Sequence, residues 1–115
     1  MSFILAIMMM SVAVPTDRWI PVSVNGGPQR DYLDRHSIQR GGNKVTLWTK
    51  RDFAGQQRTL WHEIEVDCAA KSDTVIAWVE DNAGAVTHNL VRPHRPSATI
   101  PPNSLGQSIF DLVCR

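Results

Sequence analysis

Cysteine is scarce in this chain: 115 residues contain only two, Cys68 and, next to last, Cys114. They do not form a CxxC pair, which excludes a dithiol redox motif, and two cysteines alone make a poor zinc site. In an exported protein the two cysteines are free to form a disulfide. The chain-entropy model predicts that a disulfide closing a loop of this size stabilises the fold by about 4 kcal/mol. Two unpaired buried thiols, as in a cytosolic protein, are the alternative.

A strong charge of either sign is also missing. Twelve basic and eleven acidic residues leave a net charge of +1 at pH 7, which provides no large field to attract nucleic acid or an anionic membrane. No GxSxG, HExxH or glycine-rich phosphate loop occurs. We therefore predict a protein that is not an enzyme, binds no nucleic acid and needs no cofactor.

Metal-ligand spacing is absent from the four histidines, His36, His62, His88 and His94. No two of them form an HxH or HxxxH pair, so we predict no metal site. His62 falls on the aliphatic face of a predicted strand and is interpreted as a hydrogen-bonded core histidine.

The N-terminal residues 3–14 carry no charge. This run is too short to span a bilayer as a helix, and its length is typical of the apolar region of a secretory signal. Small residues at Ser11 and Ala13 predict a signal peptide over 1–13, one domain over 14–115, and no transmembrane span in the mature chain. No Lys or Arg precedes the apolar run, which implies either a start further upstream or a weak signal. A buried N-terminal strand or helix is the alternative to a signal peptide.

Short strands separated by turn residues follow. We expect six, at residues 18–24, 29–34, 44–53, 57–67, 74–81 and 85–91, with a short connection at 36–40. Successive strands joined by tight turns predict an antiparallel meander. Residues 92–103 hold four of the seven prolines, which excludes a helix or an inner strand and predicts an extended crossing over the sheet.

The C-terminal residues predict one helix. Ser104 and Gln107 have capping-box spacing, in which each side chain bonds the other's amide. Apolar residues then recur on one helical face, at Leu105, Ile109, Leu112 and Val113. The predicted fold is therefore α+β: an antiparallel meander sheet of about six strands with this helix packed on it. A Cys68–Cys114 bond would fasten the helix to the end of the fourth strand.

Two tryptophans, Trp48 and Trp61, are the candidate partner-binding residues. Strand alternation places Trp48 with Thr46 and Lys50, and Trp61 with Glu63 and Glu65. Exposed aromatic residues are favoured at interfaces, so the pair would form a binding platform. The alternative is that both rings are buried under the proline-rich crossing or at a sheet end.

Apolar residues occupy both faces of the fifth predicted strand. Alternation places Val75, Ala77 and Val79 opposite Ile76 and Trp78. One helix covers only one face of a sheet, so the other face needs a second cover. Candidates are the proline-rich crossing, sheet curvature or another subunit.

Three segments resemble the surface-adhesin protein E family. They are DYLDRHSIQRGGNKVTLWTKRDFA at 31–54, VDC at 66–68 and IPPNSLGQSIFDLVC at 100–114. The resemblance implies an antiparallel sheet with a C-terminal helix, the Cys68–Cys114 disulfide, and a bacterial cell-envelope protein.

The function that the resemblance implies is binding. The family is named for an outer-membrane adhesin that binds host matrix proteins and forms dimers. We therefore expect an exported binding module of the periplasm or cell surface, with a protein partner or a second copy of the chain. A small periplasmic carrier of an apolar ligand or haem, using the concave sheet, is the alternative function.

Overall fold

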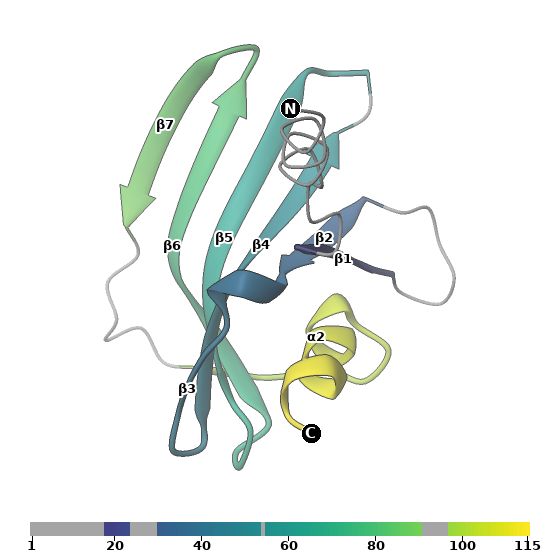
Figure 1. The fold of residues 1–115 in the computed structure, drawn as a ribbon, viewed down its shortest axis with the longest axis vertical. Helices are drawn as coiled ribbons and strands as arrows, with labels where there is room; N and C mark the ends of the chain where they lie inside the picture. The colour runs from purple at the N-terminus through teal and green to yellow at the C-terminus, as the bar shows by residue number, and fades with distance from the viewer. Residues whose placement is uncertain (1–17, 24–29, 54, 91–96) are drawn as a thin grey trace, which may run out of the picture.

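One antiparallel sheet of eight strands forms the body of the protein (Figure 1). The structure, a computed structural model, describes residues 18–23, 30–53, 55–90 and 97–115. Six strands follow the order β1-β2-β4-β5-β6-β7, while β3 pairs with β4 and β8 with β6. The strands are β1 (Trp19–Val22), β2 (Asp31–Asp34), β3 (Gln39–Gly41), β4 (Lys44–Phe53), β5 (Arg58–Asp67), β6 (Ser72–Asn82), β7 (Ala85–Leu90) and β8 (Ala98–Thr99). The predicted meander is confirmed, whereas the predicted signal peptide lies outside the described residues.

Two short strands were not predicted. The expected connection at 36–40 is a 3₁₀ turn, η1 (Arg35–Ser37), followed by β3, which pairs with the first residues of β4. Within the expected crossing, β8 pairs with Ser72 and Asp73 of β6. Proline blocks an inner strand but tolerates an edge, so the two proline-free residues of β8 can join the sheet there. Residues 92–96 of that crossing lie outside the described residues.

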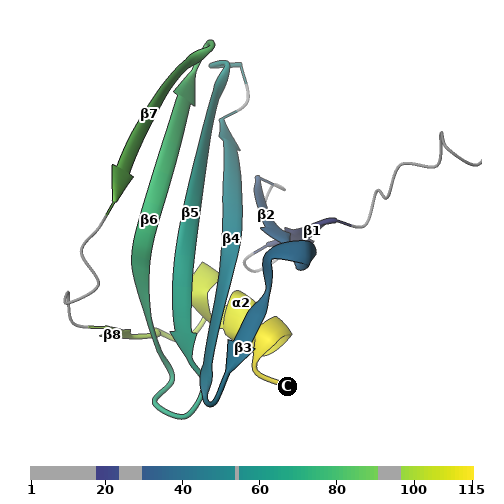
Figure 2. The same ribbon diagram turned by 60° about the vertical axis from the view of Figure 1, so that its left-hand side comes forward.

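In the part of the chain that the structure describes, one helix, α2 (Leu105–Val113), covers one face of the sheet and lies behind β4 and β5 in Figure 2. Ser104 caps it as predicted, accepting a 3.1 Å hydrogen bond from the Gln107 amide. The predicted return bond is wrong: Gln107 Oε1, which would accept it from the Ser104 amide, has no hydrogen-bond partner, while Gln107 Nε2 donates to Asp111 Oδ1. Within the described ranges, no helix has the length and apolar character needed to cross a membrane.

The core lies between α2 and the sheet. Its fully buried side chains include Leu33, Leu47, Val66 and Val113. We call this side of the sheet the helix face and the opposite side the outer face. Because burial of apolar surface drives folding, this layer is what holds α2 on the sheet.

The helix is also attached at three polar or covalent points. The predicted disulfide is confirmed: Cys68 and Cys114 are bonded, with their α-carbons 5.5 Å apart. Arg40 of β3 donates to the carbonyl of Val113, and Ser108 Oγ donates to the carbonyl of Ser23 beside β1. Since a short terminal helix tends to fray, the disulfide and the Arg40 bond fix its last turn, while the Ser108 bond attaches its first half.

A β-bulge changes the predicted faces of β6. The register pairs Glu63 with Ala77 but Ile64 with Val75, so Ile76 is an extra residue on β6. An extra residue breaks strict alternation. Val75 therefore shares the helix face, not the face of Ala77 as predicted, and it packs against the core.

Candidate binding surface

Trp48 and Trp61 lie together on the outer face. Their strands pair so that Trp48 is opposite Glu63, and Lys50 is opposite Trp61. Trp48 and Trp61 are thus diagonal neighbours on adjacent strands. Residues in this position lie about 7–8 Å apart, a distance that aromatic side chains can span. Both are partly exposed and neither is at a sheet end.

Two further aromatic residues, Trp19 and Tyr32, were missed by the sequence analysis. The register places Tyr32 opposite Lys50, so Tyr32 lies on the outer face. Trp19 lies on the same face, because it is two residues from Pro21, which is opposite Tyr32. Lys50 Nζ lies 4.5 Å from the centre of the Trp19 ring and 5.4 Å from that of Tyr32. Both distances are within the range of a cation–π contact of about 6 Å.

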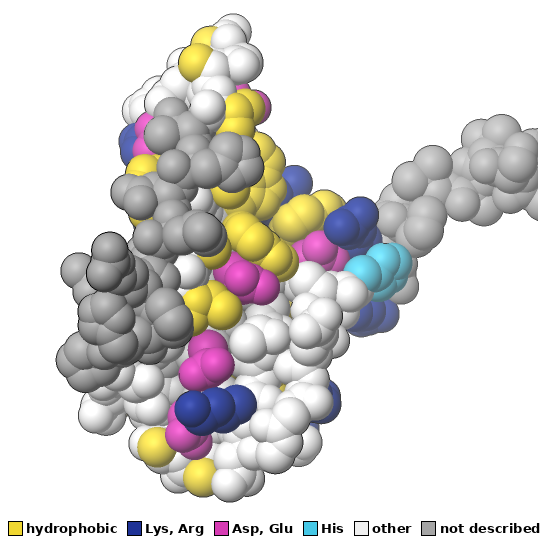
Figure 3. All heavy atoms as spheres, turned by 90° about the vertical axis from the view of Figure 1, so that its left-hand side faces the viewer, with side chains coloured by type: hydrophobic (Ala, Val, Ile, Leu, Met, Phe, Trp, Pro, Cys, Tyr) yellow, Lys and Arg dark blue, Asp and Glu magenta, His cyan; other side chains and the backbone are white. Residues whose placement is uncertain are grey.

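We call the surface formed by Trp19, Tyr32, Lys50, Trp48 and Trp61 the aromatic face. Figure 2 shows β1 and β2 turned out of the plane of the longer strands, which cups this side of the sheet. Figure 3 shows hydrophobic side chains gathered on it, with acidic side chains among and below them. Alternation within one strand could not place Trp19 and Tyr32 on this surface, because their position depends on the pairing of β1 with β2 and of β2 with β4.

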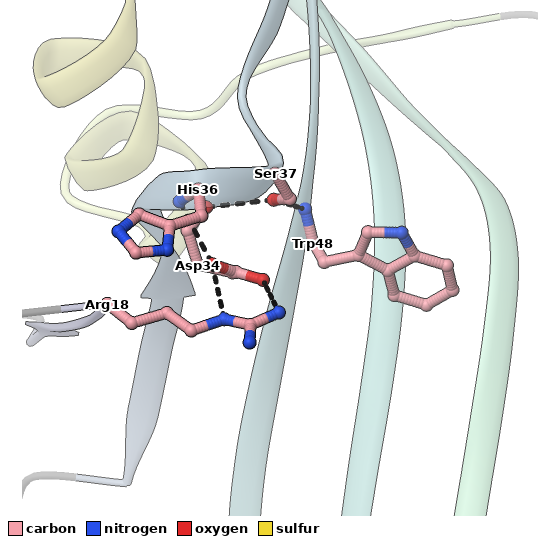
Figure 4. A network of polar contacts seen from close by, with 5 residues as sticks. All are labelled: Arg18, Asp34, His36, Ser37 and Trp48. Carbon is pink, nitrogen blue, oxygen red and sulfur yellow. Dashed lines mark hydrogen bonds and ion pairs between the residues drawn. The ribbon is translucent and has the colours of Figure 1, made fainter. Parts of the chain in front are cut away.

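A polar network joins η1 to β4 at Trp48 (Figure 4). Asp34, whose exposed fraction is 3%, accepts hydrogen bonds from Arg18 Nε and Nη2, both 3.1 Å, and from the His36 amide. The Ser37 hydroxyl donates to the Asp34 carbonyl and accepts from the Trp48 amide, both at 2.8 Å. Figure 4 shows the Trp48 ring projecting away from Arg18. The network therefore binds the backbone amide of Trp48 and leaves its ring to form part of the surface.

Polar groups continue the outer face beyond the tryptophans. Lys44 Nζ lies 3.5 Å from Glu65 Oε1. Near them is a shallow depression of about 280 Å³, lined by Gln39, Arg40, Gly41, Lys44, Thr46 and Glu65. The face therefore combines aromatic rings with charged side chains, as protein interfaces commonly do.

A separate small cavity of about 130 Å³ lies on the helix face, beside Leu105 of α2. His62 lines it, on the aliphatic face where it was predicted. Burial, and then the nearby Arg51 guanidinium, lower the pKa of His62 below its usual 6.5, which favours the neutral ring at pH 7. Arg51 is itself bonded to Asp31, with Nε 2.7 Å from Oδ1.

Metal-ligating side chains do not gather in groups of three or more within the described ranges. The side chain of His88, and His94 altogether, lie outside the described residues. That the protein holds no metal and no cofactor stays a prediction.

Comparison with known proteins gives one match. The sequence model of the family described as surface-adhesin protein E matches residues 19–115, which include the whole described sheet, α2 and both bonded cysteines. None of the curated proteins and none of the solved structures compared with this chain matches it. A surface-adhesin family implies an exported protein of the cell surface. The chain belongs to the surface-adhesin protein E family.

Proposed function

We propose that this protein is a non-enzymatic binding module of the cell envelope, which engages a protein partner through its aromatic face. The observation that carries the proposal is the gathering of Trp19, Tyr32, Trp48 and Trp61 on one face of the sheet, where the last two are partly exposed. Tryptophan and tyrosine dominate the binding energy of protein interfaces.

The rigidity of the surface supports the same function. Trp48 and Trp61 stand on two ten-residue strands that pair along their whole length. The Ser37–Trp48 hydrogen bond fixes the backbone of β4 at Trp48. Side chains presented by a rigid scaffold lose little conformational entropy on binding, which favours affinity.

The partner that we propose is a matrix protein of a host, met at the cell surface, because the family is one of surface adhesins. A second copy of the chain is the other candidate. It would use the same face in a self-complementary contact. A periplasmic location would favour the second copy or another envelope protein over a host protein.

The test is binding of the mature protein to a panel of immobilised extracellular-matrix proteins, measured by surface plasmon resonance. We expect at least one of them to bind, and the double substitution Trp48→Ala with Trp61→Ala to weaken that binding at least tenfold. Trp78→Ala is the matched control, because the register pairs Trp78 with His62 on the helix face. Sedimentation velocity of the same proteins would detect self-association.

The outcome that contradicts the proposal is equal binding by the wild-type protein and the double variant, with both folded by circular dichroism. Self-association that the double variant abolishes, with no matrix protein bound, would identify a second copy as the partner.

A carrier of an apolar ligand or haem is the alternative function, and the cavities lined by described residues favour it less. The cavity on the helix face measures about 130 Å³ and is lined partly by charged residues. Sites for small molecules usually measure roughly 300–1,000 Å³ and are mostly apolar. Haem titration followed by absorbance spectroscopy would test this function, and a stoichiometric complex would favour it over the binding module.

A further inference from the structure

We propose that the partner presents a lysine or arginine side chain to the aromatic face, where the cation lies over Trp48 and Trp61 and pairs with the Glu63 carboxylate. The inference rests on the proposed function, since it names the chemistry of the partner at the same surface. Three observations carry it: the position of Glu63, the excess of acidic groups around it, and the contact that Lys50 already makes on this face.

Glu63 lies beside the two tryptophans. It is directly opposite Trp48 across β4 and β5, and it is two residues from Trp61 along the same face of β5. On its other side it pairs with Ala77, which is 6% exposed. In the described part of the chain, Glu63 makes no ion pair and no side-chain hydrogen bond. A partly buried carboxylate without an internal partner is complementary to a cation.

The two basic side chains that β4 places on this face are already engaged. Lys44 pairs with Glu65 at 3.5 Å, and Lys50 lies over the rings of Trp19 and Tyr32. Neither of them neutralises Glu63. Within the described residues no cation pairs with this carboxylate, which leaves it available to a cation of the partner.

Charge on the two central strands is also unbalanced. The β4–β5 register places two basic residues on the outer face, Lys44 and Lys50, against four acidic ones, Asp52, Glu63, Glu65 and Asp67. Complementary potentials select partners and speed their encounter. The surface accordingly matches a basic segment of a protein and repels an acidic one.

Lys50 shows that this face accommodates a cation over aromatic rings. Its ammonium group lies 4.5 Å from the Trp19 ring centre. The proposed site repeats that arrangement one strand further along the sheet and adds a carboxylate. Arginine suits such a site well, because its planar guanidinium stacks on an indole while bonding a carboxylate.

The experiment is an NMR titration of the folded protein, observing the indole N–H signals of the tryptophans. The probe is a short peptide of alternating arginine and glycine, and its control is the same peptide with glutamine at every arginine. We expect the arginine peptide to shift the Trp48 and Trp61 signals and leave the Trp78 signal in place, while the glutamine peptide shifts none of them.

Matched variants test the role of the carboxylate. Glu63→Gln should weaken binding of the arginine peptide five- to tenfold. Glu65→Gln, on the same face of the same strand, should change it less than twofold because Glu65 is paired with Lys44. Equal effects of the two substitutions would overturn the inference. So would a neutral oligosaccharide such as maltohexaose that shifts the two signals while the arginine peptide does not.

The two proposals fail in different ways. If Trp48→Ala with Trp61→Ala abolishes binding of a matrix protein but Glu63→Gln does not, the proposed function stands and the basic partner is wrong. If the arginine peptide binds at Glu63 but no protein partner depends on the tryptophans, the cation site stands and the proposed function is wrong.

Discussion

Ser37 Oγ accepts a 2.8 Å hydrogen bond from the Trp48 amide at the point where β4 changes its partner. β2 pairs with β4 only as far as Thr49, and β3 begins its pairing at Thr46. Between these pairings the Trp48 N–H would lack an acceptor, and a buried amide without one is unfavourable. The Ser37 hydroxyl of η1 supplies the acceptor. This one side chain therefore links η1 to the strand that carries Trp48 of the aromatic face.

Ser37→Ala should lower the free energy of unfolding by about 1–3 kcal/mol, because it leaves both the Trp48 amide and the Asp34 carbonyl without a partner. Urea unfolding measures the change. Ser37→Thr, which keeps the hydroxyl, should lose much less. An alanine variant with the wild-type midpoint would show that solvent satisfies these groups.

Much of the fold could be predicted because its signals are local. Turn residues separate the strands, Ser104 caps α2, and the cysteine positions match the bond observed between β5 and α2. Local signals could not predict β3 and β8. Their two or three residues become strands only because an edge of β4 or β6 is available to pair with them.

The aromatic face was predicted in part, for the same reason. Alternation correctly placed Trp48 and Trp61 on a polar face, since neither β4 nor β5 is interrupted between them. It misplaced Val75, because the Ile76 bulge has no recognisable pattern in the sequence. Trp19 and Tyr32 join the surface through the pairing of β1 and β2, which alternation within one strand does not specify.

The disulfide should provide a large part of the stability. Cys68 and Cys114 are 46 residues apart, and closing such a loop stabilises a fold by up to about 4 kcal/mol. Cys68→Ser with Cys114→Ser should therefore lower the free energy of unfolding by about 2–4 kcal/mol, measured by urea unfolding. The loss should begin at α2, so amide exchange of Ile109 should increase more than that of Leu47. Uniform exchange at both sites would contradict a specific attachment of the helix.

The β6–β7 turn offers a stabilising substitution. Ala83 and Gly84 connect the strands with φ of 51° and 95°. Positive φ is unfavourable for alanine, whereas asparagine tolerates it and Asn-Gly is the favoured pair in such two-residue hairpins. Ala83→Asn should raise the free energy of unfolding by about 0.5–1 kcal/mol. Ala85→Asn, one residue into β7, is the control, and it should not stabilise the protein.

Asp73 gives a prediction about pH. Its side chain lies under the first turn of α2: a β-carbon added at Gly106 would be 3.0 Å from Asp73 Oδ2, so glycine leaves room for this approach. Burial raises the pKa of Asp73 above its usual 3.8. The folded protein therefore binds this proton more tightly than the unfolded chain does. The stabilisation from the proton is complete below pH 3.8 and is lost as the pH rises through the folded-state pKa.

Asp73→Asn should consequently make the protein more stable than wild type at pH 7, and the difference should shrink as the pH falls toward 4. The gain should stay under about 1 kcal/mol, because solvent screens this partly exposed carboxylate. Thermal unfolding of both proteins at several pH values between 4 and 7 measures it. The opposing effect is the partial positive charge at the start of α2, which favours an ionised carboxylate nearby. If that attraction outweighs burial, the asparagine variant will be the less stable protein at pH 7, and the helix terminus rather than desolvation will govern the titration of Asp73.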